Sequence, residues 1–122
     1  MSMEISTRLG DQLARYLDLA ASEAKLTAAN MANIDTPGYR AIGMDFSSEM
    51  RSAIHGADQG LPPGKVRLKA VEGLIARPDG NDVSMDRESL NLAEAQLKFK
   101  VGVALLRSEN QSVLDAIHAD GK

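Results

Sequence analysis

The order of apolar and polar residues predicts a long amphipathic helix near the start of the chain, from about residue 7 to residue 33. Apolar side chains recur there at intervals of three and four positions, which places them on one face of a helix. Such a helix buries this face against a neighbour and leaves the opposite face in water. The stripe consists of Leu9, Leu13, Tyr16, Ala20, Ala24, Ala28 and Met31.

A second long helix is predicted from about residue 86 to residue 119, with Asp86 as its N-cap and Gly121 as its stop. Its main stripe advances in alternating steps of four and three residues, which is the heptad spacing of coiled coils. Two of its positions are polar, which lowers stability but can fix the register. The stripe consists of Leu92, Gln96, Phe99, Val103, Leu106, Asn110, Val113 and Ile117.

The second helix carries more apolar surface than one partner helix can cover, because a further stripe widens its N-terminal half. Two helices that lie side by side bury one stripe each and leave the other faces in water. We therefore expect other chains to complete the burial, and the alternative is a self-contained helical bundle. The further stripe consists of Leu90, Ala93, Leu97, Val101 and Leu105.

The middle of the chain, residues 34–85, is predicted to be mostly irregular because proline and glycine interrupt it. Pro37-Gly38 fits the two central positions of a type II turn, and a further turn is expected over residues 78–81. Proline also disfavours helical geometry at the residue before it, so the first helix should end ahead of this turn.

Two short elements are predicted within this middle segment. A helix over residues 44–55 would be capped by Asp45 or Ser47. Basic and apolar residues alternate over residues 65–71, which predicts a strand with one face in water. Residues 74 and 75 could supply a return strand, so a small β-hairpin is expected there.

Composition and charge narrow the classes of protein that the chain can represent. Its 122 residues fit a single domain, residues 1–122. Aromatic residues make up only 3% of the chain, which disfavours an enzyme with a deep pocket. The lack of cysteine excludes disulfides and thiolate metal sites. The net charge of −3 is spread evenly, so the sequence shows no basic patch for nucleic acid.

The sequence matches no catalytic, cofactor-binding or metal-binding pattern. His55 and His118 lie far apart, and neither has a carboxylate or a second histidine at ligand spacing. Residues 79–86 begin like a calcium loop but lack the third acidic ligand and the glycine that such a loop requires. A small hydrolase would need a nucleophile and a base, and the sequence indicates no such pair. We therefore expect no enzyme, no cofactor and no metal ion.

The most informative segment is Ala29–Tyr39, at the end of the first predicted helix. Asn30 and Asn33 lie three residues apart where helix carbonyls lack partners, so their amides can bond those carbonyls or a neighbouring subunit. Thr36 can hold the turn through side-chain-to-backbone bonds. Physically, the segment is either a well-capped helix end or a contact site between chains.

This segment resembles the Ala-Asn-x-Ala-Asn-x-x-Thr-x-Gly-Tyr signature of the flagellar rod and hook family, and every defined position is met. Residues 40–46 and 79–97 resemble the continuation seen in the proximal rod subunit of that family. Two departures stand out, since Phe99 replaces the usual tyrosine and residues 108–115 are more acidic and polar than expected. The signature residues are Asn30, Asn33, Thr36, Pro37, Gly38 and Tyr39.

The resemblance implies a structural subunit of the proximal rod of the bacterial flagellar basal body. Its fold would be all-α, with the long helices paired as an antiparallel, coiled-coil-like hairpin. The subunit would pass through type III export without a cleaved signal peptide and lie on the periplasmic side of the inner membrane. It would join a homo- and hetero-oligomeric helical assembly that transmits motor torque.

Expected partners are other rod subunits, the rod-base adaptor protein, the membrane ring and the export gate, with no nucleic acid and no small-molecule substrate. The alternatives are a different rod subunit of the same family, or a stand-alone helical-hairpin interaction protein. Residues 45–46 and 79–81 disfavour the first, and the signature turn disfavours the second. The assembly interface is expected to include Leu13, Tyr16, Leu92, Leu97, Phe99, Val103, Leu106, Val113 and Ile117.

Overall fold

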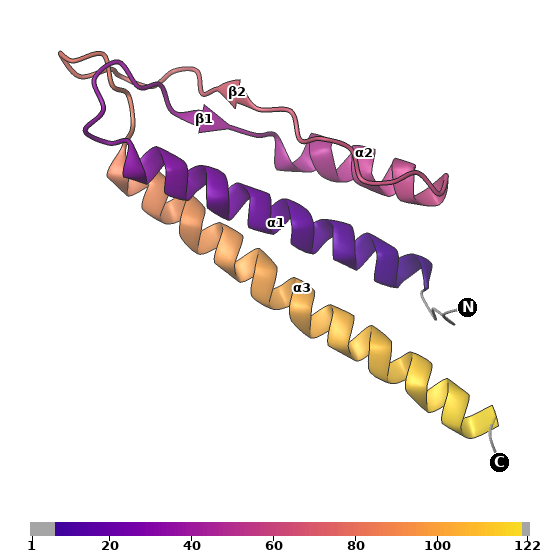
Figure 1. Cartoon of the computed structure of the whole chain (residues 1–122). Coiled ribbons are helices and arrows are strands. Elements are labelled where there is room, and N and C mark those ends of the chain that lie inside the picture. Colours follow the sequence, from indigo (N-terminus) through magenta and orange to yellow (C-terminus); the bar gives the residue numbers. More distant parts are fainter. Residues whose placement is uncertain (1–6, 121–122) are drawn as a thin grey trace.

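Two long antiparallel helices and a shorter arm make up the part of the chain, residues 7–120, that the computed structural model describes (Figure 1). α1 and α3 lie side by side, and α2 lies along another side of α1, so the predicted all-α fold with paired terminal helices is confirmed. No helix within residues 7–120 is both long enough and apolar enough to span a bilayer. The elements are α1 (Arg8–Ala32), β1 (Ile42–Gly43), α2 (Phe46–Asp58), β2 (Lys69–Ala70) and α3 (Met85–Asp120).

α1 begins and ends where the sequence predicts because polar side chains cap both of its ends. Thr7 is the N-cap, and its hydroxyl accepts a hydrogen bond from the Gly10 backbone N–H at 2.9 Å. Asn33 is the C-cap, and its Nδ2 donates to the Ala29 carbonyl at 2.8 Å. These bonds satisfy backbone groups that a helix end otherwise leaves unpaired.

α3 starts slightly earlier than predicted. Its first residue is Met85, and the Ser84 hydroxyl accepts a hydrogen bond from the Arg87 N–H at 3.3 Å. The prediction that Asp86 is the N-cap is therefore wrong. Asp86 lies inside the first turn, where its charge suits the positive end of the helix dipole. Gly121, which was expected to stop this helix, lies outside the described residues.

Polar contacts fix the antiparallel register of α1 and α3. Thr7 Oγ1 donates to Glu109 Oε1 at 2.7 Å near the start of α1, and Lys98 Nζ donates to Glu23 Oε1 at 3.1 Å further along. Between these contacts Leu17 and Tyr16 of α1 lie against α3 in the seam of the two helices. The buried apolar residues of the two helices are Leu13, Leu19, Ala20 and Ala95.

The two helices approach each other closely at Gly102 of α3, which is buried. A Cβ atom at this position would lie 2.7 Å from Leu17 Cδ2 and 3.0 Å from Tyr16 Cδ1. Glycine inside a helix costs about 1 kcal/mol relative to alanine. The close approach gives a physical reason for a residue that helix propensity alone disfavours.

α3 is longer than α1 and extends beyond it. The helices have 36 and 25 residues, which at 1.5 Å per residue is roughly 54 and 38 Å. Because Thr7 lies opposite Glu109, residues 110–120 continue past the start of α1 (Figure 1). We call residues 110–120 the α3 overhang.

α2 is anchored against both long helices at its start. The rings of Phe46 and Tyr16 meet edge to face, with their centroids 5.6 Å apart. Lys98 Nζ of α3 lies 3.9 Å from the centroid of the Phe46 ring, which is cation–π geometry. At the other end of α2, Asp58 pairs with Arg8 at 2.8 Å.

The short middle helix is confirmed, and Asp45 is its N-cap, with Oδ1 accepting from the Ser48 N–H at 3.2 Å. It ends at Asp58, later than the predicted residue 55, because the stop signal is a glycine beyond it. Gly60 has a φ of +70°, which suits the residue after a C-cap. The Leu61 N–H then turns back to the Gly56 carbonyl at 2.8 Å.

The predicted β-hairpin is wrong. β2 pairs in antiparallel fashion with β1, with Ile42 opposite Ala70 and Gly43 opposite Lys69, while residues 74 and 75 form no strand. Alternation along the chain identifies an extended segment but not its partner. The partner lies in the segment after the signature turn, far earlier in the sequence.

Candidate functional site

The signature turn has the geometry that Pro37-Gly38 predicts. Gly38 has a φ of +76°, and the Tyr39 N–H donates to the Thr36 carbonyl at 3.2 Å. This is a type II turn, whose third position favours glycine because a positive φ strains other residues. The turn reverses the chain directly after α1 and places Tyr39 beside Asn30.

Asn30 is the buried centre of the site. Its Nδ2 donates to the Ile42 carbonyl at 2.8 Å and to Glu88 Oε1 at 3.1 Å. Its Oδ1 accepts from the Tyr39 hydroxyl at 3.0 Å and from the Ile42 N–H at 3.1 Å. One amide therefore joins α1 to the turn, to β1 and to α3, and its two donors and two acceptor sites are all in use. These bonds lie within the chain, and a contact of this segment with a neighbouring subunit stays a prediction.

Glu88 supplies the part of α3 in this site. Its side chain is buried, and Oε1 also accepts from Arg87 Nη1 at 2.8 Å, while Oε2 has no hydrogen-bond partner among the described residues. Burial, helped by the negative charge of Glu88, raises the pKa of Tyr39 above its ordinary value of 10.0. Tyr39 therefore stays protonated and donates to Asn30 at neutral pH.

Asn81 joins the loop before α3 to the signature turn. Its Nδ2 donates to the carbonyls of Asn33 and Thr36, both at 2.8 Å, and its Oδ1 accepts from the Val83 N–H at 2.8 Å. Within the turn, the Thr36 hydroxyl donates to Asn33 Oδ1 at 3.0 Å. The side-chain amide of Asn81 therefore holds the loop before α3 against the signature turn, although these two segments lie far apart in the sequence.

Asp82 fastens the strand that follows the turn. Its Oδ1 accepts from the Ala41 N–H at 2.6 Å, and its Oδ2 pairs with Arg40 Nε at 3.0 Å. Asp82 is buried, whereas Arg40 reaches solvent. Five polar residues together hold the end of the hairpin at which α1 ends and α3 begins. We call them the closed-end network: Asn30, Tyr39, Asn81, Asp82 and Glu88.

The face of α3 that turns away from α1 is apolar and exposed. Leu90 and Leu97 are 61% and 63% exposed, and Val101 and Leu105 are exposed as well. These four residues, which we call the outer stripe, recur at steps of seven, four and four. An exposed apolar stripe of this kind fits a partner helix.

The nine residues predicted at the assembly interface differ in exposure, and their role between chains stays a prediction. Three are exposed: Leu97, Phe99 and Ile117. Four are half-buried: Leu92, Val103, Leu106 and Val113. The two from α1 make contacts within the chain, since Leu13 is buried and the Tyr16 ring packs against Phe46.

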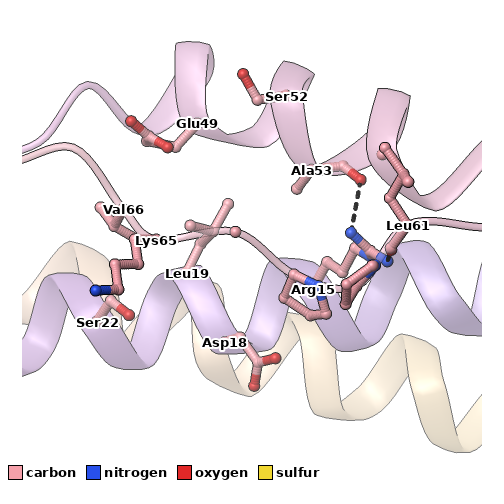
Figure 2. A pocket seen from close by; sticks show the side chains of 14 residues that line it. Arg15, Asp18, Leu19, Ser22, Glu49, Ser52, Ala53, Leu61, Lys65 and Val66 are labelled. Atoms are coloured by element: carbon pink, nitrogen blue, oxygen red, sulfur yellow. Dashed lines mark hydrogen bonds between the residues drawn. The ribbon is translucent and has the colours of Figure 1, made fainter.

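A cleft of about 330 Å³ separates α1, α2 and the segment after α2 (Figure 2). Arg15 crosses it and donates to the carbonyls of Ala53, at 3.3 Å, and Leu61. Glu49, on the α2 side, already pairs with Arg67 at 3.0 Å. Within residues 7–120 no group of three or more His, Asp or Glu side chains could hold a metal ion.

Sequence reasoning missed the structural roles of Asn81, Asp82 and Gly102. Asn81 follows a turn glycine, and its place in the sequence predicts only a position in that turn. A signal did exist for Gly102, because an isolated glycine in the middle of an apolar helix often marks a close packing contact. The Asp82 contact to Ala41 had no local signal, since the two residues meet only when the chain has folded.

Comparisons with known proteins find relatives that align along most of the chain. The flagellar basal body rod protein FlgB of Salmonella typhimurium is 33% identical over 119 residues, covering 83% of this chain and 86% of that protein. Its counterpart in Yersinia ruckeri is 29% identical, covering 83% and 87%. That of Escherichia coli K12 is 28% identical over 121 residues, covering 84% and 88%. A scan against protein-family models gives no match.

Proposed function

Because this chain belongs to the FlgB family of flagellar basal body rod proteins, we propose that it is a structural subunit of the proximal rod. It assembles with copies of itself and with other rod subunits through α1 and α3. The rod-base adaptor protein, the membrane ring and the export gate are its further neighbours. The subunit reaches the periplasmic side of the inner membrane through type III export, without a cleaved signal peptide.

The outer stripe is the observation that carries this proposal. Leu90 and Leu97 are more than half exposed although they lie on the longest helix of the described residues. Full burial of one leucine side chain contributes roughly 1.5–3 kcal/mol. A helix that covered the stripe would therefore gain several such contributions. The loss of translational and rotational freedom on association offsets part of this gain.

The contacts are heterologous, which means that the outer stripe of one subunit packs on a different surface of the next. Contacts of this type do not close on themselves, and their repetition produces a helical tube. Within residues 85–120 α3 is one uninterrupted helix without proline. Such a continuous helix is suited to passing torque along the axis of the tube.

Substitution of Leu97 by glutamine tests this proposal in the source bacterium, with the variant replacing the resident gene. Leu97→Gln should shrink the swimming zone and lower the amount of the chain in isolated basal bodies several-fold. The free energy of unfolding of the purified subunit should stay within about 0.5 kcal/mol of wild type, since exposed positions tolerate such changes.

Leu68→Gln is the matched control, because Leu68 has a similar exposure of 56% but lies next to β2 rather than on α3. Cells with this control should swim normally. The proposal would be refuted if the wild-type chain were absent from basal bodies. Normal swimming of a variant that carries glutamine at every position of the outer stripe would also refute it.

A further inference from the structure

A second apolar surface lies at the closed end of the hairpin. Ile75 is 92% exposed, the highest value among the large apolar side chains of the described residues. It lines an open hollow together with Leu74, with Ile34 after the end of α1 and with Met85 at the start of α3. We call these four residues the end patch. Met85 is 40% exposed, while Ile34 and Leu74 are half-buried. An apolar hollow that includes one almost fully exposed isoleucine indicates a surface that a partner covers.

The opposite end of the molecule presents an apolar helix end. The α3 overhang is roughly 16 Å long, from its 11 residues at 1.5 Å each. Leu114 and Ile117 of the overhang are 48% and 42% exposed. No described residue of α1 can cover them, since α1 begins opposite Glu109. The overhang is therefore a short helix with apolar side chains and no neighbour within residues 7–120.

The overhang carries negative charge. Its sequence contains Asp115 and Asp120 and no lysine or arginine. The last carbonyl groups of a helix add a partial negative charge, equivalent to about half an elementary charge. A surface that accepts this helix end should offer a cation near apolar side chains.

The end patch meets that requirement through Arg77, which lines the same hollow. Its guanidinium donates to the carbonyls of Val83, at 2.7 Å, and Ile34, and it forms no ion pair within residues 7–120. Asp82, which also lines the hollow, is already paired with Arg40. The two carbonyls fix the position of the Arg77 guanidinium but leave its positive charge uncompensated.

We propose that the end patch of one subunit receives the α3 overhang of a second copy of this chain. Ile117 and Leu114 pack on Ile75 and its neighbours, and Arg77 faces the helix C-terminus with Asp115. The inference rests on the proposed function, and it names the contact that joins subunits end to end. Because donor and acceptor surfaces lie at opposite ends of one chain, the contact is heterologous and can repeat.

Disulfide crosslinking tests this contact cleanly because the chain has no cysteine. Ile75→Cys and Ile117→Cys are combined in one chain, which replaces the resident gene in the source bacterium. Isolated basal bodies are then exposed to a mild oxidant and separated on a non-reducing gel. We expect linked dimers and longer species, at least tenfold above the level in either single variant. The matched control combines Ile117→Cys with Leu68→Cys, which should give no such series.

Each outcome bears on a different statement. A crosslinked series from the 75–117 pair, absent from the control pair, supports the inference. If the pair variant is present in basal bodies and the cells swim, but the pair does not crosslink, the inference is overturned and the proposed function stands. If the wild-type chain is absent from basal bodies, the proposed function fails and the inference fails with it.

Ile75→Asp provides a second readout, because a side chain that is almost fully exposed can be changed without unfolding the subunit. It should lower the incorporation of the chain into basal bodies several-fold, while the thermal melting of the purified subunit stays unchanged. Wild-type incorporation of Ile75→Asp would overturn the inference.

Discussion

The closed end of the hairpin and the outer face of α3 use side chains in opposite ways. At the closed end, asparagine, aspartate and glutamate side chains are buried and hydrogen-bonded. On the outer face of α3, leucine and valine side chains point into water. Buried polar groups must find partners to avoid a desolvation penalty, and the closed-end network supplies most of them within the chain. The exposed apolar groups have no such partners within residues 7–120.

The difference indicates a division between folding and assembly. Directional hydrogen bonds set one geometry for the turn and the helix ends, so the closed end can form in a single subunit. Apolar burial is non-directional and proportional to area, so the outer stripe gains stability only when another chain arrives. The following substitutions test whether the two regions are separable in this sense.

Asn30→Ala should have the largest effect on the free subunit. It leaves the Ile42 backbone groups, Glu88 and the Tyr39 hydroxyl without their shared partner, and each buried unsatisfied group costs about 1–3 kcal/mol. We expect the free energy of unfolding to fall by about 3–5 kcal/mol, measured by urea denaturation followed by circular dichroism.

The control for this variant is Asn33→Ala, which removes two exposed bonds at the end of α1, to the Ala29 carbonyl and from the Thr36 hydroxyl. Because water can replace these exposed partners, their loss should cost about 1 kcal/mol. Equal losses for the two variants would show that the closed-end network does not depend on its buried centre.

Gly102→Val should destabilise the hairpin by about 2 kcal/mol, since overpacking of a close contact typically costs 1–3 kcal/mol. The added atoms meet Leu17 and Tyr16, which would have to move. Ala104→Val places the same side chain at an exposed position of the same helix, where it meets no close contact, and should cost about 0.5 kcal/mol. Thermal melting of both variants measures the difference, and a smaller loss for Gly102→Val would contradict close packing here.

Tyr39→Phe should cost about 1 kcal/mol at neutral pH, because it removes the hydroxyl that donates to Asn30. It should also change the response to alkaline pH. The pKa of Tyr39 is raised in the folded state, so the folded state retains a proton that the unfolded state loses above pH of about 10. The contribution of Tyr39 to the free energy of unfolding is therefore fully present below that pH and decreases above it.

The measurement compares urea denaturation of wild type and Tyr39→Phe from pH 8 to pH of about 11, across the ordinary tyrosine pKa. Wild type should lose more of its free energy of unfolding over this interval than the variant does. Parallel curves would mean that the Tyr39 hydroxyl does not contribute to the alkaline loss.

Phe99→Ala should have the smallest effect on the free subunit, because its ring is already 43% exposed. Incorporation into basal bodies should nevertheless fall further for Phe99→Ala than for Arg67→Ala. Arg67 pairs with Glu49 inside its own chain and lies outside α3, so it adds nothing to the exposed apolar surface of that helix. Quantitative immunoblots of basal bodies compare the two, and equal losses would contradict the assignment of Phe99 to assembly.

Elements that depend on local signals were predictable from the sequence. Thr7 and Asn33 cap α1 where the apolar stripe begins and ends, and Gly38 sits where the turn requires a positive φ. The start of α3 is an exception, since the sequence predicted Asp86 as the N-cap but the helix begins at Met85, after Ser84, and both residue types are good N-caps. Predictions of this kind depend only on residues that lie close together in the sequence.

Contacts between distant segments were not predictable in the same way. The pairing of Ile42 with Ala70 and the bonds from Asn81 to the signature turn form only after the chain has folded. The sequence identified Asn30 as part of the candidate site, but the alternation of polar and apolar residues contains no information that Glu88 would be its partner.

Lys98 links the position of α2 to the alignment of the long helices. Its ammonium contacts Glu23 on α1 and the ring of Phe46 at the start of α2. Sliding of α3 along α1 by one helical turn, about 5.4 Å, would carry this charge out of reach of both. Axial load on α3 would therefore reach α2 through Lys98, in addition to the load that α1 passes to α2 through its own contacts.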